Sequence, residues 1–206
     1  MDVKLAETTV PVHEALRRRW SPRAFDTCPI ELEKLRSLFE AARWAPSCFN
    51  TQPWHYLVAT KDDPLNYQRV LNCFIKSNQG WAKNAPVVAL SVARLNFEHN
   101  GEPNRHAFHD VGQATANLAM QAATLGLQIH QMAGILPDRA RTIFGIPEGY
   151  EPVAGIALGY SGDPGLLPEK LRNRELAPRE RKPLASFVFT KCWGQALQFT
   201  ALKPKP

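Results

Sequence analysis

The chain has 206 residues, 44% of them hydrophobic, and a formal net charge of +6 at pH 7. A chain of this size can bury one core, and chains divide into domains mainly above roughly 250 residues, so we expect a single domain over residues 1–206. No apolar run approaches the ~20 residues that span a bilayer, and residues 1–10 lack a basic start followed by an apolar core. We therefore expect a cytoplasmic protein with no membrane partner.

The basic charge is concentrated in two short stretches, residues 17–23 and 172–182. Such charge can attract nucleic acid, a membrane surface or a phosphorylated small molecule, or it can be a solvated surface. Two compact clusters fit the two sides of a site for one small anion better than a long nucleic-acid stripe. We therefore expect no nucleic-acid partner.

In the first half of the chain, helical and strand-like patterns alternate. The predicted elements are, in order, a helix after Pro11 that ends near Arg19, a helix between Pro29 and Pro46, a strand at 54–60, a helix carrying Val70, Leu71, Phe74 and Ile75, and a strand at 86–93. The last of these is apolar throughout, which predicts burial on both faces.

The second half continues in the same manner. The predicted elements are a helix at 111–125, a passage through 129–134, a short helix at 137–144, a strand at 152–160, a long loop at 161–183, and a strand-like segment at 184–189. This succession predicts an α+β fold. Loops as long as 161–183 are usually functional.

Several common sites lack their motifs. The sequence has no GxGxxG or GxxxxGK[ST] phosphate loop and no GxSxG nucleophile elbow. The four cysteines form no CxxC pair, and His106 and His109 have no carboxylate and cysteine set nearby that would complete a metal site. We therefore expect no metal, and a surface or capping role for the two histidines.

The segment Arg18–Arg19–Trp20–Ser21–Pro22–Arg23 places arginines at a helix end, followed by a Ser-Pro turn. Guanidinium groups bind phosphate oxygens through two parallel hydrogen bonds, which lysine cannot do. The segment therefore predicts a phosphate site. The alternative is a basic helix end that only satisfies the last carbonyl groups.

The segment 45–54, with sequence APSCFNTQPW, holds small and amide side chains between two prolines. Prolines restrict the backbone, and amide groups can hydrogen-bond the edge of a heteroaromatic ring. The alternative is a turn that precedes a strand.

Together the two segments closely resemble the nitroreductase family, in which an arginine, serine, arginine, phenylalanine segment and a Pro-Ser-x-x-Asn-x-Gln-Pro-Trp segment are signatures. The resemblance continues through Leu125–Gly126–Leu127, Gly134, 158–160 and 179–184, and it covers residues from about 10 to 193. It implies an α+β fold with a central mixed β-sheet flanked by helices. It also implies an intertwined homodimer that binds FMN at the subunit interface, with a C-terminal arm (184–206) that crosses to the partner.

The resemblance also implies the residues that hold FMN. On the phosphate and pyrimidine side it implies Arg18, Arg19, Trp20, Ser21 and Arg23, joined by Arg179 and Arg181. From the other subunit, against the ribityl chain and ring, it implies Pro46, Ser47, Cys48, Asn50 and Gln52. Along one flavin face it implies Gln131, Met132, Ala133 and Gly134, with a backbone amide directed at the ring nitrogen that receives hydride, and Asn78 at the pyrimidine edge.

Two departures from the family pattern bear on chemistry. Ala133 stands where some members have a glutamate that helps to seat the nicotinamide, and Cys48 stands where others have serine. The segment 94–109, where members carry variable lid helices, is short. The pocket residues that it offers are Phe97, His99, His106, Phe108 and His109.

The implied function is an oxidoreductase in which NADH or NADPH reduces bound FMN, and a nitroaromatic, quinone or similar electron-poor acceptor then takes the same place in a ping-pong sequence. The flavin supplies the chemistry, so no catalytic side chain is implied. A flavin-using relative with another reaction, such as dehalogenation, flavin breakdown or oxidation of a peptide heterocycle, is the near alternative. A basic binding module without catalysis is the distant one.

Overall fold

The computed structural model describes residues 4–201. It contains a four-stranded sheet in the order β1-β2-β4-β3. The strands are β1 (Trp54–Thr60), β2 (Val87–Arg94), β3 (Gln128–Met132) and β4 (Tyr150–Gly159). All three pairings are antiparallel. The strand order places β2 and β4 in the middle and makes β1 and β3 the edge strands.

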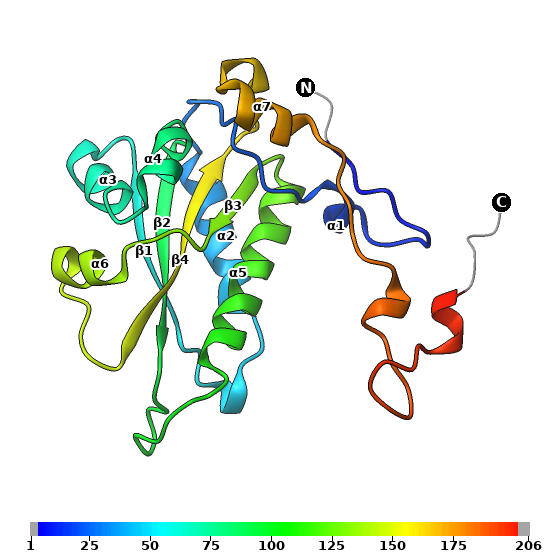
Figure 1. The fold of residues 1–206 in the computed structure, drawn as a ribbon. Coiled ribbons are helices and arrows are strands. Elements are labelled where there is room, and N and C mark those ends of the chain that lie inside the picture. Colours follow the sequence, from blue (N-terminus) through cyan, green and yellow to red (C-terminus); the bar gives the residue numbers. More distant parts are fainter. Residues whose placement is uncertain (1–3, 202–206) are drawn as a thin grey trace.

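Helices cover both faces of the sheet (Figure 1). The α-helices are α1 (Glu14–Arg18), α2 (Leu32–Arg43), α3 (Pro64–Leu71), α4 (Lys76–Ala82), α5 (Ala107–Thr124), α6 (Pro137–Phe144) and α7 (Glu169–Leu176). One face lies under α3, α4 and α6, and the other lies under α2 and α5 (Figure 1). Among residues 4–201, no helix has both the length and the apolar character that crossing a membrane requires.

The continuous apolar pattern of β2 is explained by these two layers. Side chains alternate between the faces of a strand, so successive residues need apolar neighbours on opposite sides. Val88 and Leu90 belong to the cluster that includes Phe74, whereas Val87 and Ala89 belong to the cluster that includes Leu118 of α5. The prediction of a strand buried on both faces is confirmed.

Local signals also set the ends of α6. Pro137 occupies the first turn, where its missing N–H is not needed. Gly145 follows the helix in the left-handed conformation with φ of 63°, which glycine adopts without steric cost. The predicted helix at 137–144 is confirmed to the residue for this reason.

Two predicted details of the first half need correction. The third helix ends at Leu71, and Phe74 and Ile75, which were predicted in it, lie in the connection to α4, a helix that was not predicted. Phe74 is fully buried and packs against Gly155, where a Cβ would lie 2.7 Å from its ring. The sequence pattern could not separate the two cases, because an apolar residue that enters the core from a loop looks the same in the sequence as one on a helix.

The second half departs from the prediction after β4. The predicted loop at 161–183 contains the 3₁₀ turn η2 (Pro164–Leu166) and α7. The segment 184–189 is not a strand: it forms the 3₁₀ helix η3 (Leu184–Ser186) and one isolated bridge between Phe189 and Ala196. A strand needs a neighbour for its N–H and C=O groups, and this arm stands away from the sheet (Figure 1).

The expected mixed sheet is also not formed, because the pairings among the described strands are antiparallel. The arm was the remaining strand-like segment of the sequence, and within residues 4–201 it contributes no strand to the sheet. The α+β class itself is confirmed.

The turn after β4 generates a test of packing. Gly162 donates a backbone hydrogen bond of 2.8 Å to the carbonyl of Ala24, and a Cβ there would lie 2.5 Å from the carbonyl carbon of Phe25. We predict that Gly162→Ala lowers the free energy of unfolding by about 2 kcal/mol, since backbone atoms must move to relieve the overlap. Urea denaturation at fixed protein concentration measures this. In the control Gly80→Ala, the new methyl group has no heavy atom within 4 Å, so stability should stay the same or rise. Equal stability of the two variants would contradict the predicted overlap at Gly162.

Candidate functional site

The segment after α1 runs beside the edge strand β3, and we call residues 19–24 the arginine turn. Gln128 of β3 holds its start: the side-chain Nε2 donates to the carbonyl of Arg18 and the Oε1 accepts from the Trp20 N–H, both at 3.1 Å. Further along, His130 Nδ1 lies 2.8 Å from the carbonyl of Pro22. Because a carbonyl only accepts, Nδ1 carries the proton and donates. Two side chains of an edge strand thus fix a segment that has no regular structure.

The end of the arginine turn is held from α7. The carboxylate of Glu175 accepts hydrogen bonds from the backbone N–H of Arg23 at 2.8 and 3.0 Å and from that of Ala24 at 3.0 Å. Glu175 is only 3% exposed. The sequence reasoning missed Gln128, His130 and Glu175. The alternation of polar residues in β3 was a usable signal for the first two, but a glutamate within a charged stretch gives none.

Arg179 joins the second basic stretch to the first. Its guanidinium donates to the carbonyls of Lys4, Arg17 and Arg19 at 2.7 to 2.8 Å. Burial lowers the pKa of Arg179, and the nearby charges of Arg19 and Arg181 lower it further. This arginine therefore holds the backbone of the arginine turn in addition to placing positive charge beside it.

Arg19, Arg179 and Arg181 form a cluster of guanidinium groups, which we call the guanidinium cluster. Burial lowers the pKa of Arg19, and the charge of Arg181 adds to the effect. Arg19 also donates to the hydroxyl of Ser21 at 3.3 Å. Within residues 4–201, none of the three forms an ion pair with an aspartate or glutamate. Like charges that are brought together without a counter-ion form a site for an anion.

The other arginines of the first stretch point elsewhere. Arg18 pairs with Glu14 at 2.8 Å, one helical turn away. The guanidinium of Arg23 lies 5.9 Å from the ring centre of Trp81. The ring of Trp20 lies under the Lys4 ammonium at 5.2 Å. Of the expected phosphate residues, the structure therefore brings together Arg19, Ser21 and the two tail arginines. Arg18, the last residue of α1, instead pairs with Glu14 of the same helix.

The loop after β3 is fixed by α4. The carbonyl of Gly134 accepts from Asn78 Nδ2 at 3.0 Å and from the Ile75 N–H at 3.1 Å. A Cβ on Gly134 would lie 2.6 Å from both side chains, so glycine is needed for this approach. Gln131 and Ala133 are exposed beside it, whereas the side chain of Met132 is buried in the core, so Met132 can line a site only through its backbone.

The segment 45–54, which we call the second motif, contains a strained, exposed turn. Its residues Phe49, Asn50 and Gln52 have φ of 51°, 54° and 47°, the left-handed region that costs L-residues about 1 kcal/mol or more each. Asp110 of α5 accepts from the Cys48 N–H at 3.0 Å, and Ser47 Oγ accepts from the Gln52 N–H at 3.0 Å. Strain that is held in place by specific bonds is typical of functional segments. Asp110, buried at the start of α5, was not predicted.

Aromatic side chains gather next to this turn. The ring of Phe49, which is 81% exposed, lies 5.8 Å from Phe97 and 6.3 Å from His99, and the last two are 5.5 Å apart. The expected pocket residue Phe97 thus meets the second motif. Phe108 and His109 lie exposed on the first turn of α5, and the backbone N–H of His106 donates to Asn104 just before that helix.

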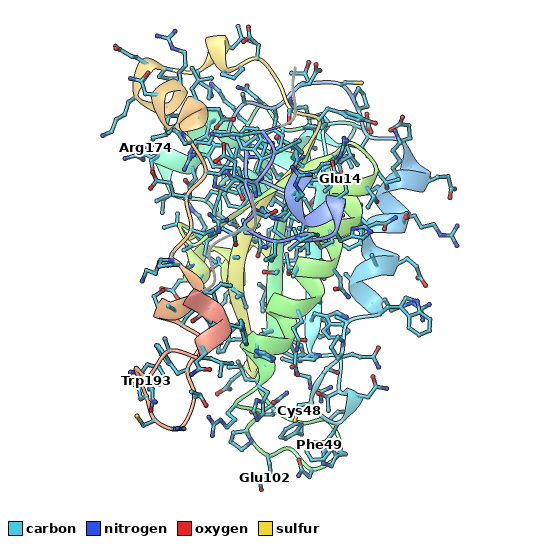
Figure 2. The ribbon with its side chains drawn as sticks, turned by 90° about the vertical axis from the view of Figure 1, so that its right-hand side faces the viewer. Glu14, Cys48, Phe49, Glu102, Arg174 and Trp193 are labelled. Carbon is cyan, nitrogen blue, oxygen red and sulfur yellow. The ribbon has the colours of Figure 1, made fainter. Side chains whose placement is uncertain are left out.

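The two motifs lie at opposite ends of α5. Asp110 near its start binds Cys48, and Gln128, just after its end, binds Trp20. The 14 residue steps from Asp110 to Thr124 span about 20 Å of helix. Figure 2 shows Cys48 and Phe49 at one end of the molecule and Glu14 and Arg174 toward the other. One chain therefore does not bring the two motifs into one site.

Comparison with known proteins covers the part of the chain that contains both motifs. The sequence profile of the nitroreductase family matches residues 16–77 and 70–160, which include both motifs. A solved structure described as an oxidoreductase containing FMN superposes with a TM-score of 0.87 at 36% identity, over 94% of this chain and 98% of that chain. An FMN-dependent nitroreductase from Clostridium difficile R20291 superposes with a TM-score of 0.62 at 25% identity, over 72% of this chain and 87% of its own. A NADH dehydrogenase of Thermus thermophilus is 28% identical over 200 residues, which cover 80% of this chain and 95% of that protein.

His130 makes the stability of the arginine turn dependent on pH. Burial lowers its pKa to about 4, although the hydrogen bond to Pro22 opposes this effect. Its ring also lies 4.5 Å from that of Trp81. Since the pKa of an unfolded histidine is about 6.5, the unfolded chain binds more protons between these values. The stabilising contribution of neutral His130 is therefore complete above about pH 6.5 and is lost as the pH falls toward 4.

We predict that acidification from pH 7 to pH 5 lowers the free energy of unfolding by about 2 kcal/mol through His130. Urea denaturation at the two pH values measures the loss. His130→Gln keeps a donor for the Pro22 carbonyl and cannot titrate, so the difference between its two values should be smaller by that amount. An unchanged difference in the variant would show that other groups cause the effect.

Proposed function

The chain belongs to the nitroreductase family, and we propose that it is an FMN-dependent oxidoreductase that uses NADH or NADPH to reduce nitroaromatic, quinone or similar electron-poor acceptors. The observation that carries the proposal is the guanidinium cluster: Arg19 donates to the Ser21 hydroxyl, and none of the three guanidinium groups forms an ion pair with a carboxylate among the described residues. The relatives described as containing or depending on FMN support the choice of cofactor.

The cluster fits one terminal phosphate. A phosphate dianion takes guanidinium and hydroxyl donors, and the charge of Arg19 and Arg181 remains available because neither is paired with an acidic side chain within residues 4–201. Arg179 holds the carbonyl groups of the turn, so it contributes charge and shape. A single such cluster favours FMN over FAD.

The loop after β3 would receive the flavin ring. Gln131 and Ala133 are exposed, and Gly134 is held by Ile75 and Asn78, so the backbone of this loop is both accessible and fixed. A flavin held by this loop would supply the hydride and electron transfer between the reduced nicotinamide nucleotide and the acceptor, and in the proposed ping-pong sequence these two molecules would use the same place in turn. The protein's part is then to bind, orient and shield, which needs no acid or base side chain.

We further propose that the protein is a homodimer in which each flavin site combines the arginine turn of one subunit with the second motif of the other. The support is the separation of the two motifs along α5 and the strain of the second motif in a single chain. The arm also carries exposed aromatic side chains, among them Phe187 and Trp193, the latter 93% exposed. Such surface is typical of subunit contacts.

A groove on the outer side of α5 is consistent with such a contact. It is lined by residues of α5, the end of α2 and the region of α1, including Trp44, Asn117 and Met120. Trp44 is 74% exposed. An arm that crosses to the partner would cover apolar surface of this kind.

The first test is the chromophore. We predict that the purified protein is yellow, or becomes yellow with added FMN, and that heat releases FMN rather than FAD. Arg19→Ala and Arg181→Ala should each weaken FMN binding about tenfold or more, since each leaves phosphate charge uncompensated. Fluorescence titration with FMN measures this.

Arg18→Ala is the comparison variant. Because Arg18 is exposed and pairs with Glu14, its removal should change FMN affinity by no more than about threefold. Colourless protein that does not bind added FMN would defeat the proposed function and favour a basic binding module without catalysis. Equal losses in all three variants would defeat the assignment of the phosphate site.

The shared site predicts complementation between inactive subunits. At an FMN concentration that only the wild type binds well, Arg19→Ala chains and chains altered at both Asn50 and Gln52 should each have little activity as homodimers. After subunit exchange at equal amounts, mixed dimers hold one intact site each, and about a quarter of wild-type activity should return. No recovery despite exchange proven by mass spectrometry, or an active monomer in sedimentation, would contradict the two-chain site.

A further inference from the structure

The carboxylate of Glu175 lies in a position that is unfavourable for a negative charge. It lies in the last turn of α7, where the helix dipole disfavours a negative group, and it is 3% exposed. A buried carboxylate is costly unless hydrogen bonds compensate for the lost water. Here the compensation comes from the backbone N–H groups of Arg23 and Ala24.

These two N–H groups are consecutive donors that an anion could occupy. Glu175 already fills them, so they are not available to a phosphate. As a negative charge within the second basic stretch of the sequence, the carboxylate would by Coulomb's law oppose the binding of another anion there. Its benefit must therefore lie in the conformation that it fixes.

The carboxylate joins the two basic stretches. Glu175 belongs to the second stretch and binds the donor groups of the arginine turn, while Arg179, four residues later, binds the acceptor groups of Arg17 and Arg19. The Lys4 ammonium adds a hydrogen bond of 2.6 Å to the backbone carbonyl of Glu175. The turn is thus held on both sides by one short segment that leads directly to Arg181.

We propose that Glu175 is a positioning residue for the cofactor phosphate: its carboxylate fixes the arginine turn so that Arg19 and Ser21 face Arg181 before the ligand arrives. The proposal rests on the proposed FMN site. A fixed arrangement removes the cost of ordering these side chains on binding. Glu175 itself does not touch the phosphate.

The test compares FMN with riboflavin, which has the same ring and ribityl chain but no phosphate. Both affinities are measured by fluorescence titration for the wild type, Glu175→Gln and Glu180→Gln. Glu180 lies exposed in the same segment, so its variant removes the same charge without removing the contact. We expect Glu175→Gln to weaken FMN binding about tenfold, because the amide puts an NH2 donor in place of one of the two oxygens that accept from the Arg23 N–H, and to change riboflavin binding much less.

The sign of the effect separates the explanations. If charge alone mattered, both variants would bind FMN more tightly than the wild type, and that result would overturn the proposal. A merely structural role would weaken FMN and riboflavin equally, which would overturn it as well. Glu175→Asp keeps the charge but shortens the reach, and it should also lower the preference for FMN.

The remaining outcomes are equally decisive. If Glu175→Gln does not fold, a retained wild-type preference in Glu175→Asp overturns the proposal, and failure of both variants to fold would assign Glu175 to fold stability instead. If the wild type itself shows no preference for FMN over riboflavin, the proposed phosphate site fails. A wild-type preference that persists in both folded variants defeats only the role of Glu175.

Discussion

The four-stranded sheet has no free face, and this constraint decides where a site can form. Both faces are covered by helices (Figure 1), and β2 and β4 are paired on both sides, so only the edge strands and the loops at the strand ends remain. At the edge strand β3, a side chain binds the neighbouring segment: the Gln128 amide offers the arginine turn an acceptor and a donor, as the backbone of a neighbouring strand would. The irregular turn is therefore attached to the sheet through its edge strand.

The elements that the sequence predicted well are those whose signal is local. β1 begins and ends where predicted because Pro53 and a charged, turn-forming segment bound it, and α6 does so because of Pro137 and Gly145. α7 was predicted as loop, since its sequence EKLRNREL has no apolar stripe and its one buried side chain is that of Glu175. Its stability comes from a tertiary contact that periodicity cannot show. The arm failed as a strand for a related reason, because the chain alone provides no neighbour for it.

The candidate site was predictable only where a motif names side chains. Arg19, Ser21 and the tail arginines come together as the motif implied, although they are more than 150 residues apart in sequence. The position of Arg18 was open to local reasoning, because Glu14 stands four residues earlier and captures it. Asp110 and Glu175 could not be found in this way, since each binds backbone N–H groups of a remote segment. A backbone partner leaves no trace in the pattern of side chains.

Each of the two parts of the proposed site has an unfavourable local feature that the fold maintains. At one end of α5, burial lowers the pKa of Arg19 and of Arg179, and the nearby guanidinium charges lower both further. At the other end, three residues keep left-handed backbone angles, with their turn anchored to Asp110 and Ser47. A bound anion would remove the first cost, and in the proposed dimer a second subunit would contact the strained turn. Because ligands and partners stabilise whichever state they bind, the proposed cofactor and the proposed second subunit would each stabilise one of these two features.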